Sequence, residues 1–274
     1  MSFRTSAATR RKGQRLGQHF LSDTRYLGSI LTAAALSGGD DVVEVGPGRG
    51  ILTKALLENA RKVTAIELDP GLVEFLKEKF DDSGNFRLVP GDARRLHLEE
   101  VVGSEDYKLV ANLPYYAATH ILRTFLALPN SPQVSVVMVQ REVAQQMVGT
   151  PGARTFLSHA IGIYGKASIV RTVPPKAFRP PPQVYSSIVR IEKIADNSIA
   201  WLQDIDRVAF LDFIRCGFAA PRKKLGNSLS QGLAVAADVV RDLCDAADID
   251  VSLRPSKLTT GDWWKIYDEW RRSG

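Results

Sequence analysis

Cysteine and histidine are scarce in this sequence, which has two cysteines and four histidines among 274 residues. Cys216 and Cys244 match neither a metal-binding nor a redox spacing. The histidines do not recur at the spacing of zinc ligands either. We therefore predict no metal site, and we expect both thiols to be buried and reduced.

Long hydrophobic runs are also missing. The longest, such as residues 134–139, fall far short of the ~20 apolar residues that a membrane span needs. No apolar signal-peptide core follows the first residues. We therefore expect a cytoplasmic protein that contacts no membrane. Residues 1–16 are rich in Arg, Ser and Thr and lack acids, so an organelle transit peptide stays open as an alternative.

Acidic residues are absent from the N-terminal end. Residues 1–22 carry a net charge of +5, whereas residues 23–214 sum to −1 and residues 215–274 to +2. A nearly neutral body with basic ends indicates a polyanionic partner such as a nucleic acid. The alternative is a basic tail that is only solvated.

Short apolar runs alternate with helical patterns through the first half of the chain. The runs are typical of strands covered on both faces, and the segments between them repeat apolar residues at helical spacing. This alternation predicts an α/β fold with a mostly parallel, doubly wound sheet. The predicted strands are residues 42–45, 63–66, 86–89, 107–111 and 134–139, and the predicted helices are residues 24–36, 51–57, 70–80, 119–128 and 141–148.

The pattern changes after residue 149. Residues 169–173 and 185–191 are typical of strands, and no clear helix separates them, so we expect an antiparallel pair at the sheet edge. The strand signal then ends, and residues 208–218, 239–246 and 262–270 are typical of helices. We predict a basic segment over 1–22, an α/β domain over 23–200 and a small all-α domain over 201–274.

A glycine-rich turn follows the first strand of the alternation. Gly46, Gly48 and Gly50 allow a sharp turn and a close approach of backbone to ligand. A dehydrogenase fingerprint needs its third glycine at position 51, where the sequence has Ile51. This difference argues against a dehydrogenase. A tight turn alone needs no ligand, so the loop by itself leaves function open.

Two acids end the next two strands. Glu67 lies about 20 residues past the glycine loop, where an acid can accept hydrogen bonds from both ribose hydroxyls. The alternative is a helix cap, for which Asp69 is better placed. Asp92 can accept from an adenine amino group. An adenosine site without a pyrophosphate clamp points to S-adenosylmethionine.

The fourth strand ends in Asn112-Leu113-Pro114-Tyr115. The Asn112 side-chain oxygen and a backbone carbonyl at Leu113 or Pro114 can hold an amino group, while Tyr115 stacks on its base. Two acceptors can localise the lone pair that an adenine amine otherwise shares with its ring. Positioning and electrostatics then suffice without a strong general base. The alternative is structural, because an Asn before a turn is common. At the end of the fourth strand, however, the tetrapeptide predicts methyl transfer to an adenine amine.

Together these motifs resemble the ribosomal RNA adenine N6-dimethyltransferase family, and within it the small-subunit branch. The resemblance covers roughly residues 15–270 and also rests on the run GQHFL at 17–21 and on Phe178-x-Pro180-x-Pro182-x-Val184-x-Ser186. It implies a class I (Rossmann-like) methyltransferase domain followed by a small helical domain, with S-adenosyl-L-methionine as cofactor.

The resemblance also implies roles for individual residues. The cofactor site would be lined by His19, Leu21, Gly46, Gly48, Gly50, Glu67, Asp92 and Asn112. The target adenine would be held by Asn112, Leu113, Pro114 and Tyr115, and Phe178 would close over its other face. The alternative for Phe178 is that it only packs the edge of the sheet. RNA contacts would come from Arg10, Arg11, Lys12, Arg15, Arg222, Lys223 and Lys224.

The C-terminal basic run departs from the family pattern. Pro221 and Gly226 stand at two positions where the family often has arginine, and Lys224 is an added charge. The run stays basic but loses forked phosphate contacts. This departure affects the expected RNA footprint and leaves the chemistry unchanged. The alternative is that Arg222–Lys224 is only surface charge.

The implied substrate is two adjacent adenosines in the 3′-terminal hairpin loop of small-subunit (16S) rRNA. Each would be dimethylated by a monomeric enzyme on a pre-assembled small subunit during ribosome biogenesis. One rival is the related large-subunit (23S) rRNA methyltransferase that confers macrolide-type resistance; residues 18–20 and 139–143 favour the small-subunit branch. The other is a non-catalytic nucleic-acid-binding relative, against which the intact Asn112, Pro114 and Tyr115 argue.

Overall fold

A seven-stranded sheet organises the first two thirds of the computed structural model, which describes residues 19–103, 106–195, 199–203 and 205–273. Neighbouring strands from β4 to β6 pair in parallel, whereas β9 pairs antiparallel with both β6 and β7. The predicted mostly parallel sheet and its antiparallel edge are both confirmed. The spatial order is β4 (Phe86–Pro90), β3 (Lys62–Glu67), β2 (Asp41–Val45), β5 (Tyr107–Asn112), β6 (Val134–Gln140), β9 (Ser186–Lys193) and β7 (Gly165–Val173).

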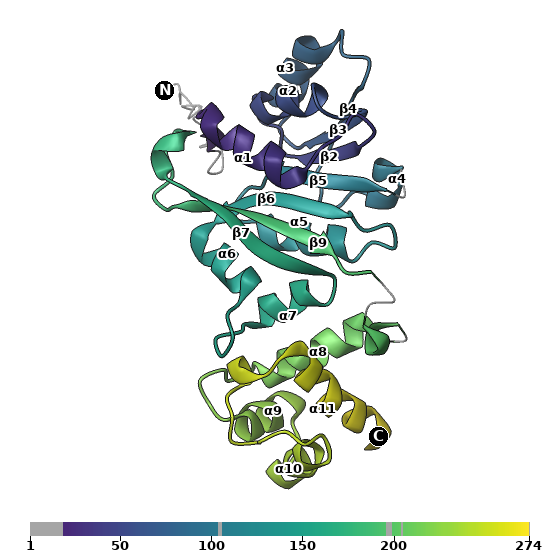
Figure 1. The fold of residues 1–274 in the computed structure, drawn as a ribbon, viewed down its shortest axis with the longest axis vertical. Helices are drawn as coiled ribbons and strands as arrows, with labels where there is room; N and C mark the ends of the chain where they lie inside the picture. The colour runs from purple at the N-terminus through teal and green to yellow at the C-terminus, as the bar shows by residue number, and fades with distance from the viewer. Residues whose placement is uncertain (1–18, 104–105, 196–198, 204, 274) are drawn as a thin grey trace, which may run out of the picture.

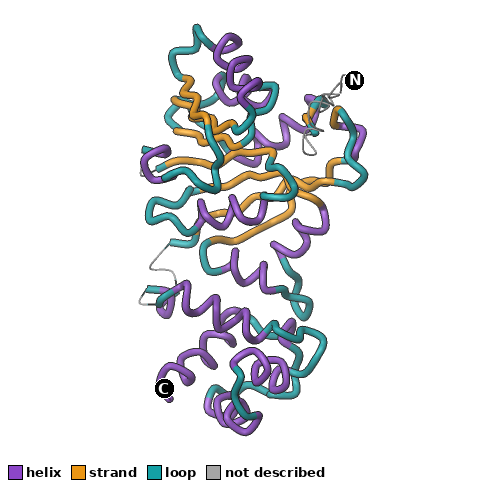
Figure 2. Tube along the Cα trace, turned by 180° about the vertical axis from the view of Figure 1, so that it is seen from behind, coloured by secondary structure: helices purple, strands orange, loops and turns teal. Residues whose placement is uncertain are grey.

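Successive side chains of the central strands supply two cores, one on each face of the sheet. In β5, Val110 packs into one core, whereas Leu109 and Ala111 pack into the other, as the two-residue period of a strand requires. Figure 2 shows helices on both sides of the strands. One core takes apolar residues of α1 (Thr24–Ala34) and α2 (Ile51–Leu57), and the other those of α4 (Leu98–Val102), α5 (Ala118–Leu126), α6 (Arg141–Val148) and α7 (Phe156–Gly162).

Local sequence explains where several helices begin. Asp23 accepts from the Arg25 backbone N–H at the start of α1. Asp69 caps α3 (Pro70–Phe80), whose proline occupies the first turn, where its missing N–H costs nothing. Thr155 and Ser158 form a reciprocal capping box at the start of α7. These caps fix the chain direction as each helix leaves the sheet.

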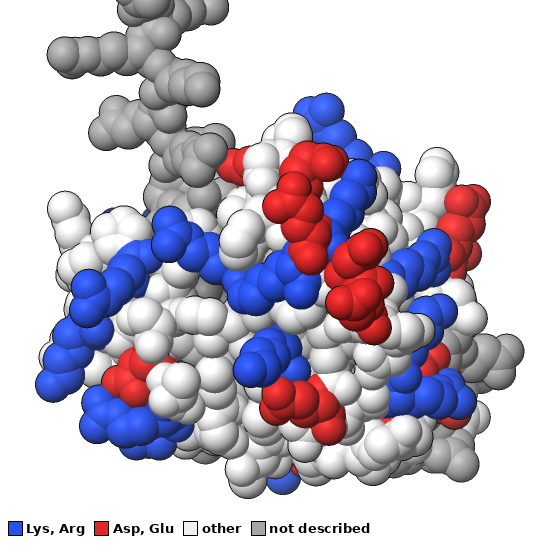
Figure 3. Space-filling view, turned by 90° about the horizontal axis from the view of Figure 1, so that it is seen from above, with Lys and Arg blue, Asp and Glu red and all other residues white. Residues whose placement is uncertain are grey.

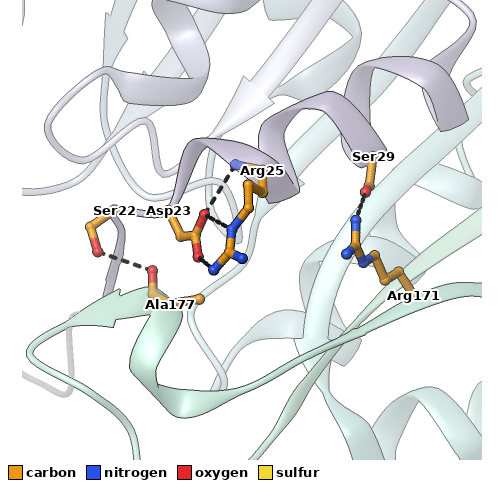
Figure 4. Close-up of polar contacts among 6 residues, drawn as sticks. All are labelled: Ser22, Asp23, Arg25, Ser29, Arg171 and Ala177. Carbon is orange, nitrogen blue, oxygen red and sulfur yellow. Dashed lines mark hydrogen bonds and ion pairs between the residues drawn. The ribbon is translucent and has the colours of Figure 1, made fainter.

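A short two-stranded ribbon ties the N-terminal end of the described chain to the segment before β9. β1 (Phe20–Leu21) pairs antiparallel with β8 (Phe178–Arg179). The backbone N–H groups of Ser22 and Asp23 both donate to the Ala177 carbonyl, at 2.9 and 3.2 Å. Figure 4 shows the Ser22 hydroxyl on the same carbonyl and Arg171 of β7 donating to Ser29 of α1. Residues 19–21 are therefore held beside the sheet.

The last four helices form a hydrophobic cluster of their own at one end of the molecule (Figure 1). They are α8 (Arg207–Gly217), α9 (Leu225–Leu233), α10 (Ala237–Ala246) and α11 (Thr260–Ser273). Ala160 and Ile163 at the end of α7 also join this cluster. The separate core supports, as our proposal, a domain boundary between 23–200 and 201–274; most of the predicted basic segment 1–22 lies outside the described residues.

The structure contains three helices that the sequence analysis did not predict, namely α4, α7 and α9. α4 has 5 residues, too few to show a helical period, and α7 has 7 residues in the part of the chain where the strand–helix alternation ends. α9 begins immediately after the basic run and was hidden by it. The predicted helices 51–57, 70–80 and 141–148 are confirmed, whereas the helix predicted to reach residue 128 ends at Leu126.

Charges of both signs share the end of the molecule where α2 and α3 lie. Viewed from above Figure 1, Lys and Arg predominate on the left side of this face, and acidic side chains gather near its centre (Figure 3). The view agrees with a nearly neutral sheet region. In the described ranges, no helix combines the length and apolar character needed to cross a bilayer.

Candidate active site

A pocket of about 320 Å³ opens at the carboxyl ends of β2, β3, β4 and β5, the edge where parallel α/β sheets place their ligands. Its volume lies within the usual range for small-molecule sites. The pocket brings together most of the predicted site residues: His19, Leu21, Gly46, Gly48, Glu67, Asp92, Asn112, Leu113, Pro114 and Tyr115.

The glycine loop adopts backbone conformations that favour glycine. Gly46, Gly48 and Gly50 have φ angles of 72°, 57° and 71°, in the left-handed region that other residues rarely enter. A Cβ on Gly48 would lie 2.8 Å from the Phe20 ring, so this glycine lets β1 close over the loop. Gly50 does not line the pocket, and a Cβ there would lie 2.6 Å from Phe80. Its position is explained by packing.

The two predicted acids occupy contrasting environments. Glu67 is buried and accepts from the backbone N–H groups of Leu68 and Asp69, each at 2.9 Å, and of Gly48 at 3.2 Å. Burial raises the Glu67 pKa despite these bonds. The Arg94 guanidinium lies 2.6 Å from Asp92 and lowers the pKa of that carboxyl to about 2. Asp92 is therefore ionised, and both of its oxygens accept hydrogen bonds from Arg94.

Glu44 also lines the pocket, although the sequence was interpreted only as a buried strand there. Its side chain accepts a 2.6 Å hydrogen bond from the Thr53 hydroxyl and is 1% exposed. Burial raises the Glu44 pKa to about 8, and the nearby Glu67 carboxylate adds to the rise. Glu44 is therefore largely protonated at neutral pH. An acid directly before the glycine loop was the available signal.

The Asn112 amide has a fixed orientation. Its Nδ2 donates to the backbone carbonyl of His19 at 3.3 Å, which leaves the side-chain oxygen as the acceptor. The Pro114 carbonyl already accepts from the Ala117 N–H at 3.0 Å. Leu113 therefore carries the better placed backbone acceptor of the two that the sequence left open.

Tyr115 is held by partners from two distant segments. Its hydroxyl lies 2.6 Å from the Ser186 hydroxyl at the start of β9. The His19 ring stacks on it with centroids 5.9 Å apart, and His19 Nδ1 lies 2.8 Å from the Pro180 carbonyl. The N-terminal motif, the strand-end tetrapeptide and the proline-rich segment therefore meet at one place.

Phe178 does not lie where the sequence placed it. Its ring is 2% exposed and does not line the pocket. It packs in the core beside Leu21, Tyr26 and Ala177. The structure thus corresponds to the alternative in which Phe178 packs the sheet edge and anchors β1.

Comparisons with known proteins agree with this geometry. Residues 9–269 match the family model described as Ribosomal RNA adenine dimethylase. The Ribosomal RNA small subunit methyltransferase A of Dehalococcoides mccartyi is 44% identical over 257 residues, covering 93% of this chain and 87% of that protein. The chain belongs to the ribosomal RNA adenine dimethylase family. The protein of the same name from Clostridium acetobutylicum is 34% identical over 262 residues, or 94% of each chain.

Solved structures share the fold of this dimethylase family member. A dimethyladenosine transferase from Plasmodium falciparum superposes with a TM-score of 0.79 at 22% identity, covering 93% of this chain and 98% of that one. The 23S rRNA methyltransferase ErmE gives 0.70 at 24% identity, covering 91% and 98%. The class I, Rossmann-like methyltransferase architecture is therefore confirmed.

Three of the seven predicted RNA-binding residues of this dimethylase family member lie away from the pocket. Arg222, Lys223 and Lys224 are exposed between α8 and α9, and none lines the pocket. A Cβ on Gly226 would lie 2.8 Å from the Val251 side chain, so a larger residue there would require Val251 to shift. The other four, Arg10, Arg11, Lys12 and Arg15, lie outside the described residues.

Two arginines at the pocket of this dimethylase family member were missed from the sequence. The Arg49 guanidinium lies over the Phe20 ring at 5.2 Å, and that of Arg94 over the Tyr116 ring at 5.5 Å. All four residues line the pocket. No spacing rule marks such pairs, because the fold alone brings each cation to its ring. In the described part of the chain, no group of three His, Cys, Asp or Glu side chains could hold a metal ion.

Proposed function

We propose that this chain transfers methyl groups from S-adenosylmethionine to the N6 amines of two adjacent adenosines. The proposed target is the 3′-terminal hairpin loop of small-subunit (16S) rRNA. The observation that carries the proposal is the Asn112 amide, whose nitrogen is engaged by the His19 carbonyl so that its oxygen is left to accept from an amine.

The pocket fits the proposed cofactor. Left-handed Gly46 and Gly48 bring the backbone close to a ligand, and Glu67 can accept from ribose hydroxyls. The ionised Asp92 can accept from the adenine amino group. When bound, S-adenosylmethionine supplies the methyl group as an activated sulfonium.

The residues after β5 prepare the target amine. The Asn112 side-chain oxygen and the Leu113 carbonyl accept its two hydrogens and turn the nitrogen lone pair away from the base. The Tyr115 ring stacks on the base, with its hydroxyl fixed by Ser186. The methylated amine is cationic and loses its proton to solvent, so positioning supplies the catalysis.

The small-subunit specificity rests on the relatives. The two bacterial proteins described above are both named Ribosomal RNA small subunit methyltransferase A. We extend that substrate to this chain and propose a cytoplasmic monomer that acts on a pre-assembled small subunit during ribosome biogenesis. The similarity to the 23S rRNA methyltransferase ErmE is at 24% identity and concerns the fold alone.

Labelled S-adenosylmethionine tests the proposal. The protein is incubated with either immature small subunits or naked large-subunit RNA, and methyl groups are mapped by mass spectrometry. We expect dimethyladenosine at two adjacent positions of the small-subunit RNA. Dimethyladenosine confined to large-subunit RNA would overturn the small-subunit target. RNA binding without any transfer would favour a non-catalytic role.

A further inference from the structure

A solvent-exposed aromatic–arginine pair stands beside the catalytic loop and has no part in the site described above. We propose that Tyr185 and Arg141 form a subsite for the RNA nucleotide next to the target adenosine. In this subsite Tyr185 stacks on the neighbouring base and Arg141 contacts its phosphate. The inference rests on the proposed function, because the target must be an RNA strand.

The pair is built as a platform. The Arg141 guanidinium lies over the Tyr185 ring at 5.3 Å from its centroid. The Arg141 backbone N–H donates to the Tyr185 carbonyl at 3.0 Å, which fixes one backbone against the other. Tyr185 nevertheless stays 45% exposed. A ring that contacts a guanidinium but stays partly in solvent is suited to stacking on a base at little entropic cost.

The backbone places this platform next to Ser186, a partner of the catalytic loop. Ser186, the next residue, is fully buried and its hydroxyl lies 2.6 Å from the Tyr115 hydroxyl. Arg141 directly follows Gln140, the last residue of β6, and β6 pairs in parallel with β5, which ends at Asn112. The platform therefore stands at the same carboxyl edge of the sheet as the residues that hold the target base. A strand that delivers one base to Tyr115 can extend along this edge and bring an adjacent base to Tyr185.

Charge favours a nucleic acid as the occupant. Arg141 is 44% exposed, and Arg94 and Arg49 stand at other points of the same strand-end edge. Aromatic rings alternating with guanidinium groups are the surface that single-stranded RNA recognises. The Glu142 carboxylate competes with a phosphate for Arg141, since it lies 3.1 Å from the Arg141 guanidinium. An exposed pair of this kind is weak, so a phosphate can replace the carboxylate.

Steady-state kinetics with the full-length protein and immature small subunits test the subsite. We expect Tyr185→Leu to raise the KM for the small subunit about 10-fold, with kcat and the KM for S-adenosylmethionine unchanged. Tyr185→Phe keeps the ring and should retain wild-type values. Glu142→Gln should lower the KM for the small subunit, because it frees Arg141.

A matched control and a crosslinking readout complete the design. Phe75 is also exposed and carries a cation, Lys79, at 5.5 Å, but it belongs to α3 at the other end of the strand order. Phe75→Leu should leave every constant unchanged. Ultraviolet crosslinking of the wild-type complex, mapped by mass spectrometry, should join Tyr185 to a nucleotide adjacent to the methylated adenosines.

The outcomes separate this inference from the proposed function. If the wild-type protein transfers no methyl groups to RNA, the proposed function itself is refuted. Normal wild-type transfer with an unchanged KM in Tyr185→Leu would refute only the subsite. So would a crosslink from Tyr185 to a protein of the subunit rather than to RNA.

Discussion

The sheet edge and the helical end of the molecule bury different chemistry. At the sheet edge, carboxyl groups such as Glu44 and Glu67 are buried next to a pocket. At the helical end, the core consists of aliphatic side chains and aromatic rings, including Phe210, Phe213 and Trp263. Burying carboxyl groups costs stability, whereas burying rings contributes it. We therefore expect substitutions at the sheet edge to change the rate of methyl transfer, and substitutions at the helical end to change the free energy of unfolding.

The largest expected effect isolates chemistry at the sheet edge. Asn112→Ala removes the acceptor oxygen, and we expect methyl transfer to fall by about 100-fold or more. RNA binding and thermal stability should stay close to wild type. Single-turnover transfer with labelled cofactor measures the loss. The exposed Asn59 on the same sheet unit provides the control Asn59→Ala. Equal activity in Asn112→Ala would remove this residue from the mechanism.

The second prediction concerns how stability depends on pH. It compares Glu44 beside the pocket with His159 of α7, which contacts the helical end. The Glu44 pKa is raised from 4.5 to about 8, so its contribution to stability is greatest below pH 4.5 and is lost as the pH rises toward 8. The His159 pKa is lowered from 6.5 to about 4 by burial, with Arg154 adding to the fall and Asp262 opposing it. Its contribution is complete above pH 6.5 and is lost as the pH falls toward 4.

Denaturant titrations between pH 4 and 8 measure these opposite slopes. Glu44→Gln should flatten the alkaline decline. His159→Gln should flatten the acidic decline, which we expect to reach about 3 kcal/mol in the wild type. His159 contacts Thr260 of α11 through Nδ1 at 2.9 Å, so the acidic loss should loosen the helical end first. Unchanged slopes in both variants would show that neither group controls the pH dependence.

Much of the sheet edge was predictable because its residues follow strand ends in chain order. Glu67 and Asn112 each end a parallel strand and Asp92 follows one, and the carboxyl ends of such strands share one edge. The placement of Phe178 was not predictable, because the β1–β8 ribbon that buries it has two residues in each strand. A strand that short shows no alternation. The Arg94–Asp92 pair is local, with its partners two residues apart, but no spacing rule marks it. α4 is too short to show a helical period, and α9 directly follows the basic run.

The third prediction concerns Gly232, a closely packed glycine of the helical end. A Cβ on Gly232 of α9 would lie 2.1 Å from the Cys216 carbonyl, a backbone atom that cannot turn aside. We expect Gly232→Ala to destabilise the helical end by about 2 kcal/mol and to leave cofactor affinity unchanged.

Substitutions at two further glycines provide comparisons for Gly232→Ala. Gly48→Ala meets the Phe20 ring and a left-handed φ of 57°, so it should weaken cofactor binding. Gly84 has open space and serves as the control Gly84→Ala. Thermal unfolding and cofactor titration read the two effects separately. A cofactor defect in Gly232→Ala would mean that the two regions are coupled.

The smallest expected effect concerns the one basic run of the helical end that we assign to RNA. Arg222, Lys223 and Lys224 are exposed, whereas the core beneath them is apolar, so charge removal should leave the fold intact. Replacing all three by Gln should reduce the slope of log affinity against log salt by about 0.7 for each RNA phosphate that the variant no longer neutralises. The exposed Lys265 on α11 supplies the matched control Lys265→Gln. If both variants keep the wild-type slope, the run is surface charge, and the helical end contributes packing without binding RNA.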